Sequence, residues 1–394
     1  MTAIEPSYDE SVRSATLAVV LVAWAVAAAA AGPASDRAPA VRRYETPYYL
    51  IHTDMEPPLA AEAVVRAKVM GDVFRKRTRE LGFGGRIDRR LPFHLMRRRE
   101  DYLATGAPAG SAGAFLGDRL VAAATGNGGG PAWHVVQHEA FHQFAAAHRG
   151  GELPAWANEG LAEYFGEALF TGDDFVTGVI PAWRLARVKR SLESGTFRPL
   201  PQFLAMTQDE WNEKVTADEA LKAHYDQAWS VVQYLLHANN GKHRGVLVEF
   251  IKSIGAGNSA SDAWREQVLD TAELEAGWRR YWIEMPDEAT PDLYATAAVQ
   301  TLTSLRARAA AAGQSFKSFD EFLDAARTGR VKFPKDQWLP PSLVAAALEW
   351  TPKDARWELT DNGVELEMSG TRRFVGRYDI ESGRVARVHV VQPS

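Results

Sequence analysis

The segment HEAFH, residues 138–142, has residue types and a spacing that suit a metal centre. On a helix, residues four apart lie on one face, so His138 and His142 would offer two imidazoles to the same ion. This H-E-x-x-H pattern is typical of zinc sites, in which the glutamate acts as a general base. The segment therefore predicts Zn²⁺ as cofactor, His138 and His142 as ligands and Glu139 as the base. His134, one turn earlier, is not assigned as a ligand, because a single additional histidine is more often a neighbour.

A second segment, WANEGLAEY at residues 156–164, would complete this site. Glu159 and Glu163 are four residues apart and share a helical face, where two carboxylates repel each other unless a positive charge lies opposite. A zinc ion held by two neutral imidazoles would supply that charge. We therefore expect Glu159 to be the third ligand and Glu163 to accept a hydrogen bond from a ligand histidine. The alternative for Glu163 is a solvated acidic surface.

Both segments are flanked by residues that begin and end helices. Pro131 follows a glycine run at 128–130 and suits the first turn of a helix over about 131–147, which the glycines at 150–151 would close. Pro154 suits the start of the second helix in the same way. The sequence thus predicts the helical geometry that the two histidines need.

Together the two segments resemble the gluzincin clan of zinc metallopeptidases, in which one helix supplies two histidine ligands and a later helix supplies a glutamate. The resemblance places His138 and His142 on the histidine ligands, Glu159 on the glutamate ligand and Glu139 on the general base. Over about residues 45–285, the chain is more similar to the bacterial peptidase MA-like domain. It lacks the Gly-x-Met-Glu-Asn strand of the clan's aminopeptidases, which argues against an aminopeptidase.

The resemblance implies an α+β, zincin-like fold, with a small mixed sheet plus helices that carry the ligands. Two strands, a hairpin and two helices are expected to build it around the metal helices. They are a strand at 48–54, a helix at 58–82, a strand at 91–96, a Gly-rich hairpin at 113–125 and a helix at 225–236.

The same resemblance implies hydrolysis of a peptide or protein substrate by zinc-activated water. Glu139 would take the proton of that water, and Tyr225, which would open its helix, would stabilise the oxyanion. His224 is the alternative electrophile, and a packing role is the alternative for Tyr225. The hairpin would bind the substrate backbone by strand addition, or else be purely structural. The candidate residues for its edge are Phe115, Leu116, Leu120 and Val121.

The chain divides into four predicted parts. Residues 1–32 contain an apolar run at 15–31 and are predicted to be a secretory signal peptide, or an N-terminal membrane anchor if they remain uncleaved. Residues 33–43 are rich in Pro, Ala and Arg and form a predicted linker. A peptidase MA-like zinc domain at 44–285 and a C-terminal domain at 286–394 follow.

Two kinds of pattern follow one another in the C-terminal domain. Helical periodicity is expected over 292–312, 318–329 and 341–349. Alternating apolar residues then predict a β-meander of three or four strands, with a hairpin turn at 361–363. We find no catalytic constellation in this domain.

Composition limits the function further. The net charge is −5 with acidic and basic residues well mixed, which argues against a nucleic-acid partner. The chain has no cysteine, so a metal must be held by nitrogen and oxygen ligands. Together with the N-terminal segment, this favours an exported bacterial protein, periplasmic or extracellular. Two functions remain: a zinc metallopeptidase, and a non-catalytic zinc-containing module that binds envelope partners. The sequence gives no indication of oligomeric state.

Overall fold

The computed structural model describes residues 41–84, 87–124, 132–148, 152–213, 218–268, 270–368 and 372–392. The predicted signal peptide or anchor at 1–32 lies outside these residues, as do residues 33–40 of the predicted linker. Within the described ranges, no helix combines the length and the apolar composition needed to cross a membrane.

The N-terminal half is built on a five-stranded mixed sheet in the order β1-β2-β3-β5-β4. The central pairs β2–β3 and β3–β5 are parallel, whereas β1 and β4 pair antiparallel at the two edges. The strands are β1 Arg42–Glu45, β2 Tyr49–Thr53, β3 Leu91–Met96, β4 Gly113–Phe115 and β5 Leu120–Ala123. Strand β1 corrects the predicted linker at 33–43, because residues 42 and 43 pair with β2 and are therefore part of the sheet.

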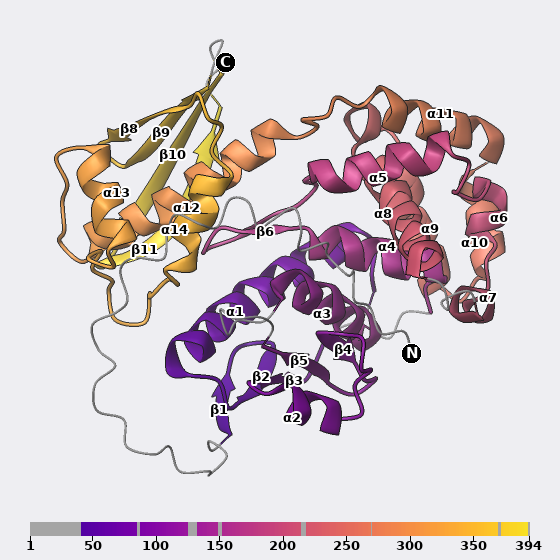
Figure 1. Cartoon of the computed structure of the whole chain (residues 1–394), viewed down its shortest axis with the longest axis horizontal. Helices are drawn as coiled ribbons and strands as arrows, with labels where there is room; N and C mark the ends of the chain where they lie inside the picture. The colour runs from indigo at the N-terminus through magenta and orange to yellow at the C-terminus, as the bar shows by residue number, and fades with distance from the viewer. Residues whose placement is uncertain are drawn as a thin grey trace.

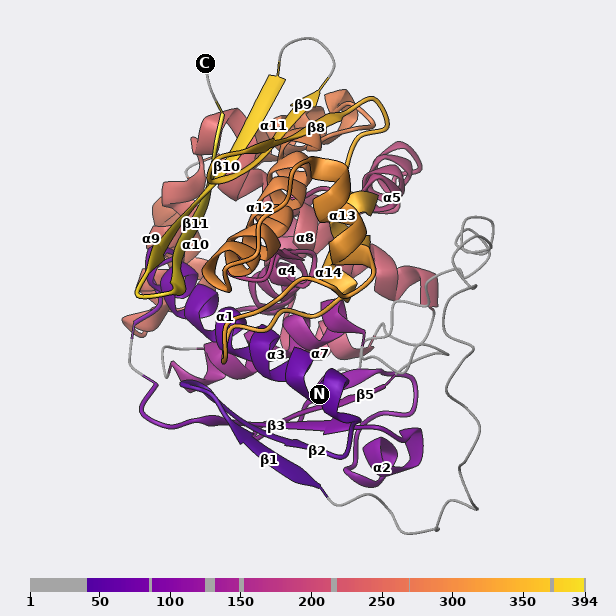
Figure 2. The same ribbon diagram turned by 90° about the vertical axis from the view of Figure 1, so that its left-hand side faces the viewer.

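Helices α1 (Pro57–Glu80) and α3 (Trp133–Ala147) lie over one face of this sheet, and the short α2 (Arg99–Ala104) follows β3 (Figures 1 and 2). The strands alternate as expected for a half-covered sheet, with Phe93 buried between partly buried neighbours in β3. Phe74 of α1 packs edge-to-face on Phe141 of α3, with ring centroids 6.2 Å apart. The apolar side of α3 is therefore fixed against α1, which leaves its polar residues to face elsewhere.

A helical region follows the sheet and carries the rest of the predicted site. Helix α4 packs along α8, and the two backbones approach closely at Gly160, where a Cβ would lie 2.5 Å from the carbonyl oxygen of Ala228. Only glycine fits this contact. The elements are α4 Ala155–Gly166, β6 Leu169–Phe170, β7 Phe175–Val176, α5 Ala182–Glu193, α6 Leu200–Leu204, α7 Gln208–Glu213, α8 Asp218–Gly241, α9 Arg244–Gly255, α10 Ala260–Gln267 and α11 Thr271–Glu284.

The C-terminal part contains the predicted helices followed by the predicted β-meander, both of which are confirmed. Its four strands form an antiparallel sheet in the order β11-β10-β9-β8, and α12 packs on it (Figure 2). The helices are α12 Pro291–Ala311, α13 Phe319–Arg327 and α14 Ser342–Glu349; the strands are β8 Arg356–Thr360, β9 Gly363–Met368, β10 Arg372–Glu381 and β11 Arg384–Val391. The chain is an α+β protein, and one continuous hydrophobic core joins the sheet, the helical region and this part.

Candidate metal centre

Helices α3 and α4 bring the three predicted ligands together. His138 and His142 lie one turn apart on α3, and Glu159 lies one turn into α4. The Nε2 atoms of the two histidines are 3.0 Å apart, and Oε2 of Glu159 lies 3.4 Å from His138 Nε2 and 3.3 Å from His142 Nε2. This cluster of three ligand atoms is nearly equilateral, and His138 and Glu159 are buried.

The geometry of this cluster fits a metal ion. Ligand atoms bonded to a tetrahedral zinc ion at about 2.0–2.2 Å lie about 3.3–3.6 Å from one another, close to the separations here. Oε2 of Glu159 is buried without a hydrogen-bond donor, a costly state for a carboxylate oxygen unless a cation faces it. Two imidazole nitrogens and one carboxylate oxygen form a donor set that holds divalent metals.

Glu139 lies beside the cluster and is held by the edge strand of the sheet. Its Oε2 accepts a hydrogen bond of 2.8 Å from the backbone N–H of Phe115 in β4, while its Oε1 is buried without a partner. Strand β4 comes close to α3 at Gly113, where a Cβ would lie 2.9 Å from a methyl of Val135. One oxygen of Glu139 is thus fixed, and the other is available to a substrate or a water molecule.

Glu163 lies one turn beyond Glu159 on α4 and contacts the back of a ligand imidazole. Its Oε1 lies 3.3 Å from Nδ1 of His138, the position predicted for it. A hydrogen bond donated by Nδ1–H leaves the lone pair of Nε2 directed at the metal position. The alternative of a solvated acidic surface is wrong, because only 14% of the Glu163 side chain is exposed.

Sequence reasoning missed the residues that surround Glu163. Arg184 of α5 is 2% exposed and pairs with Glu163, with Glu167 and with Asp226 of α8. Asp226 is shared with Arg187. No local pattern marks these residues as partners, because their contacts join separate elements. We call Glu163, Arg184, Glu167, Asp226 and Arg187 the charge network.

The charges of the site shift the pKa values of its groups. Although burial lowers it, the close carboxylates of Glu159 and Glu163 raise the pKa of His138 to about 10. Although burial raises it, the charge of His142 and the close contacts with both imidazoles lower the pKa of Glu159 to about 2. Burial raises the pKa of Glu139, with the neighbouring histidines opposing the shift. The cluster therefore attracts positive charge, which a proton on His138 or a metal ion would supply.

Carboxylates outnumber cationic side chains in this part of the molecule. The cluster, the adjacent Glu139 and the charge network contain five carboxylates but two guanidinium groups, those of Arg184 and Arg187. Burying unmatched carboxylates is costly, so a divalent cation at the cluster would offset part of this excess.

Tyr225 lies inside α8, which begins seven residues before it, and therefore does not open its helix as predicted. Its ring faces that of His138 with 6.3 Å between centroids, and it is also packed edge-to-face on Trp211. The neighbouring His224 packs instead on Trp211 and Phe203. Of the two predicted electrophiles, Tyr225 is the one whose ring contacts a ligand histidine.

The edge strand differs from the prediction. Leu120 and Val121 belong to β5, which pairs with β3 on one side and β4 on the other, so they do not form an edge. The edge is β4, which contains Phe115 and ends before Leu116. The sequence could not assign the edge because a hairpin pattern does not say which of its two strands joins the rest of the sheet.

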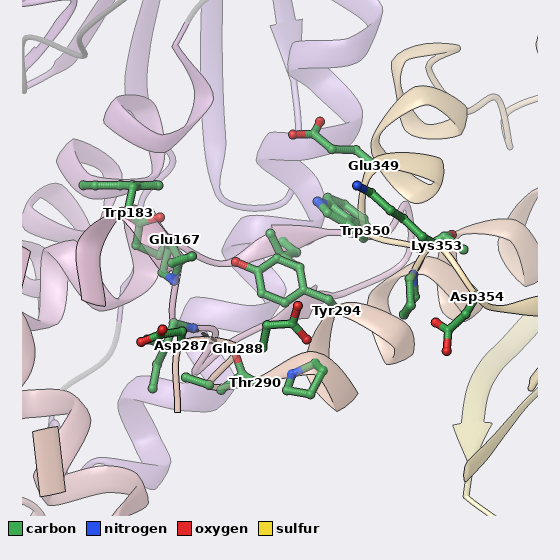
Figure 3. Close-up of a pocket in the computed structure, with 18 of the residues that line it drawn as sticks. Glu167, Trp183, Asp287, Glu288, Thr290, Tyr294, Glu349, Trp350, Lys353 and Asp354 are labelled. Carbon is green, nitrogen blue, oxygen red and sulfur yellow. Dashed lines mark hydrogen bonds between the residues drawn. The ribbon is translucent and has the colours of Figure 1, made fainter. Parts of the chain in front are cut away.

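A cavity of about 770 Å³ is lined by His134 of α3, by Glu167 directly after α4 and by residues of the C-terminal part. Figure 3 shows Tyr294 in its wall, with Trp183 and Glu167 on one side and Trp350 on the other. None of the three predicted ligands lines it. Glu167 does, so the charge network extends from the imidazole of His138 to this cavity.

Comparison with known proteins places the site within a recognised family segment. A family model, DUF1570, described as a protein of unknown function, matches residues 133–256, which run from the first residue of α3 to the end of α9. No curated protein and no solved structure matches the chain. The matched segment contains the ligand cluster, Glu139, the charge network and Tyr225. Because the family description assigns no activity, the functional conclusion depends on the geometry of this site.

Proposed function

We propose that the protein is an exported zinc metallopeptidase with a zincin-like catalytic domain. The observation that carries this proposal is the convergence of His138, His142 and Glu159 beside a carboxylate, Glu139, that has one buried oxygen without a partner. Three protein ligands leave a coordination position open, as in catalytic zinc sites, whereas structural zinc sites usually fill all four. The same observation favours an enzyme over a zinc-containing binding module, which has no use for Glu139. Export is proposed from the apolar segment at 15–31.

A zinc ion at this cluster would lower the pKa of a water molecule and polarise the carbonyl of a peptide bond. Oε1 of Glu139 is positioned to take the proton of the attacking water and to deliver it to the leaving amine. The bond from Phe115 N–H holds the other oxygen still during both transfers. The upward shift of the Glu139 pKa makes this carboxylate a better proton acceptor than an exposed one.

Two further groups would act on the substrate. The hydroxyl of Tyr225, whose ring faces His138, would donate a hydrogen bond to the carbonyl oxygen as negative charge develops on it. Strand β4 is the sheet edge next to Glu139, so an extended peptide could add to it as a further strand. A protein or peptide with an unfolded segment is therefore the proposed substrate class.

The test combines metal analysis with proteolysis of an unfolded protein such as reduced casein. We expect one zinc ion per chain and cleavage that stops on addition of a chelator and returns with Zn²⁺. Glu139→Gln should retain the ion and lower the rate by about 10²–10⁴-fold. As a matched control, Glu152→Gln changes a carboxylate that lies before α4, outside the cluster and the charge network. Stoichiometric zinc with no cleavage that depends on Glu139 would contradict the proposal and favour the binding module.

A further inference from the structure

Arg184 is a deeply buried charged side chain near the metal centre, and it contacts three carboxylates at once. Its Nη2 lies 2.6 Å from Glu163 Oε2, its Nη1 lies 2.8 Å from Glu167 Oε1, and its Nε lies 3.1 Å from Asp226 Oδ1. Its guanidinium carbon is 4.7 Å from the centroid of the Trp229 ring. Nothing in the proposed mechanism uses this residue.

We propose that Arg184 is the positioning residue of the metal centre. It would fix Glu163 behind the ligand His138 and, through Asp226, fix the segment of α8 that carries Tyr225. The inference rests on the proposed zinc site, because it says how that site is held in its binding geometry.

The first contact that supports this role runs through Glu163. One carboxylate bridges two partners: Oε2 accepts from Arg184, and Oε1 lies 3.3 Å from Nδ1 of His138. Because the two oxygens belong to one rigid group, Arg184 sets the direction in which Oε1 faces the imidazole. That direction fixes the ring so that Nε2 faces the other two ligand atoms.

The second contact runs through Asp226. This carboxylate accepts from Arg184 and from Arg187, which bonds both of its oxygens, and only 3% of its side chain is exposed. Asp226 directly follows Tyr225 on α8, so two guanidinium groups on α5 hold this turn of α8 in place. Arg184 thus joins the helices that carry Glu159, Tyr225 and itself.

Only arginine has the geometry for these contacts. Its planar group carries five N–H donors in a fixed fork, so it can bond carboxylates on three sides, whereas the ammonium of lysine is a single compact charge. Glu167 is the C-cap residue directly after α4, four residues beyond Glu163, and like charges at this spacing repel. Without the guanidinium between them, we expect Glu163 to turn away from Glu167 and to lose its alignment with His138.

The experiment measures metal binding and coordination geometry rather than activity. Zinc affinity is determined by competition with a chelating dye, and the absorption bands of the Co²⁺-substituted protein report the coordination geometry. We expect Arg184→Lys and Arg184→Gln to weaken zinc binding by about 10–100-fold and to change the Co²⁺ bands. Arg190→Gln, an exposed arginine on the same helix, is the matched control and should leave both unchanged.

A further variant separates the two contacts. Arg187→Gln removes a partner of Asp226 but none of Glu163, so it should leave zinc affinity within about threefold of the wild type and shift only the catalytic rate. Circular dichroism of each metal-free variant checks that it is folded. If Arg184→Gln does not fold, the charge-preserving Arg184→Lys decides the question.

The outcomes distinguish this inference from the proposed function. If the wild-type protein binds zinc and a folded Arg184→Lys binds it with the same affinity and the same Co²⁺ spectrum, Arg184 is not a positioning residue and the inference is wrong. A wild-type protein that binds no zinc overturns the proposed function, and this inference with it. Weakened binding and altered bands in the variant, with an unchanged Arg190→Gln, support the inference.

Discussion

Two polar clusters of the molecule differ in whether their hydrogen bonds are complete. In the first, Asp173 in the β6–β7 turn accepts from Ser304 and from both Nη atoms of Arg308 on α12. The third nitrogen of that guanidinium, Nε, donates to the carbonyl of Gln337. Each of these acceptors therefore has a donor. We call this group the Asp173 cluster, and it connects the helical region to the C-terminal part.

The second is the ligand cluster, in which acceptors face one another. Oε2 of Glu159 and Oε1 of Glu139 are buried and have no donor. The free-energy cost of burying these two oxygens has to be offset, either by a proton on His138 or by a metal ion. The Asp173 cluster, with its hydrogen bonds complete, acts as a structural tie, whereas the ligand cluster has a geometry that could hold a cation.

The largest expected effect is the loss of metal from the ligand cluster. Glu159→Ala removes one of three ligands and should weaken zinc binding by about a thousandfold, which corresponds to about 4 kcal/mol. Because bound metal stabilises the fold by mass action, the zinc-dependent rise in Tm should also disappear. Equilibrium dialysis and thermal unfolding with and without Zn²⁺ measure both effects. Unchanged zinc content would show that the metal lies elsewhere.

Arg308→Met makes the opposite change, because it breaks the Asp173 cluster and leaves the ligands intact. Arg308 is buried, and its replacement leaves the carboxylate of Asp173 without its cationic partner. We therefore expect a decrease of roughly 3 kcal/mol in the free energy of unfolding. Zinc affinity should stay within about threefold of the wild type, since the two clusters are separate. Urea denaturation and chelator competition test this pair of results. A large loss of zinc affinity in a folded variant would show that the clusters are coupled.

Tyr225→Phe tests the proposed electrophile at constant metal content. Removing one hydroxyl should lower kcat by about a hundredfold, comparable to losing one oxyanion donor elsewhere. Zinc content and Tm should remain those of the wild type, because the ring can keep its contacts with His138 and Trp211. Steady-state kinetics on a fluorogenic peptide provides the measurement. An unchanged kcat would show that Tyr225 has only a packing role.

The smallest effect is a dependence of zinc stabilisation on pH. The pKa of His138 is raised to about 10 in the folded, metal-free protein, above its ordinary value of about 6.5. Its protonation therefore stabilises the metal-free fold fully below about pH 6.5, and this contribution is lost as the pH rises toward 10.

The proposed zinc ion would replace that proton, so the rise in Tm on adding Zn²⁺ should be larger at about pH 8.5 than at about pH 6.5. Differential scanning calorimetry at the two pH values measures it. The Tm of the metal-free His138→Gln variant should decrease less than that of the metal-free wild type between these two pH values, because the glutamine side chain does not titrate. A zinc-induced rise that shrinks with pH would mean that His138 is not protonated in the metal-free protein.

Much of the fold could be predicted from local patterns. The helices that carry the ligands, the hairpin before them and the C-terminal meander all follow from periodicity and from proline and glycine positions, and each of them is present. The incorrect predictions concern places where a local pattern does not specify which element packs or pairs next to it. The local pattern predicts a helix that begins at Tyr225 and a sheet edge that contains Leu120 and Val121. The structure differs at both places, because neither boundary is set by the residues themselves.

The identity and spacing of the candidate ligands follow from local sequence patterns alone. The four-residue separation of His138 and His142 is a local property of one helix, and so is that of Glu159 and Glu163, so both could be inferred without knowing the fold.

The surroundings of these ligands depend on how distant segments of the chain pack together. Arg184 meets Glu167 and Asp226 across 17 and 42 residues of sequence, and Phe115 meets Glu139 across 24. Such contacts arise only when α4, α5, α8 and β4 pack together, with Gly160 permitting the close approach of two helices. Helical geometry sets the relative positions of residues within about two turns of one another. Which distant charges are buried side by side depends instead on the packing of separate elements.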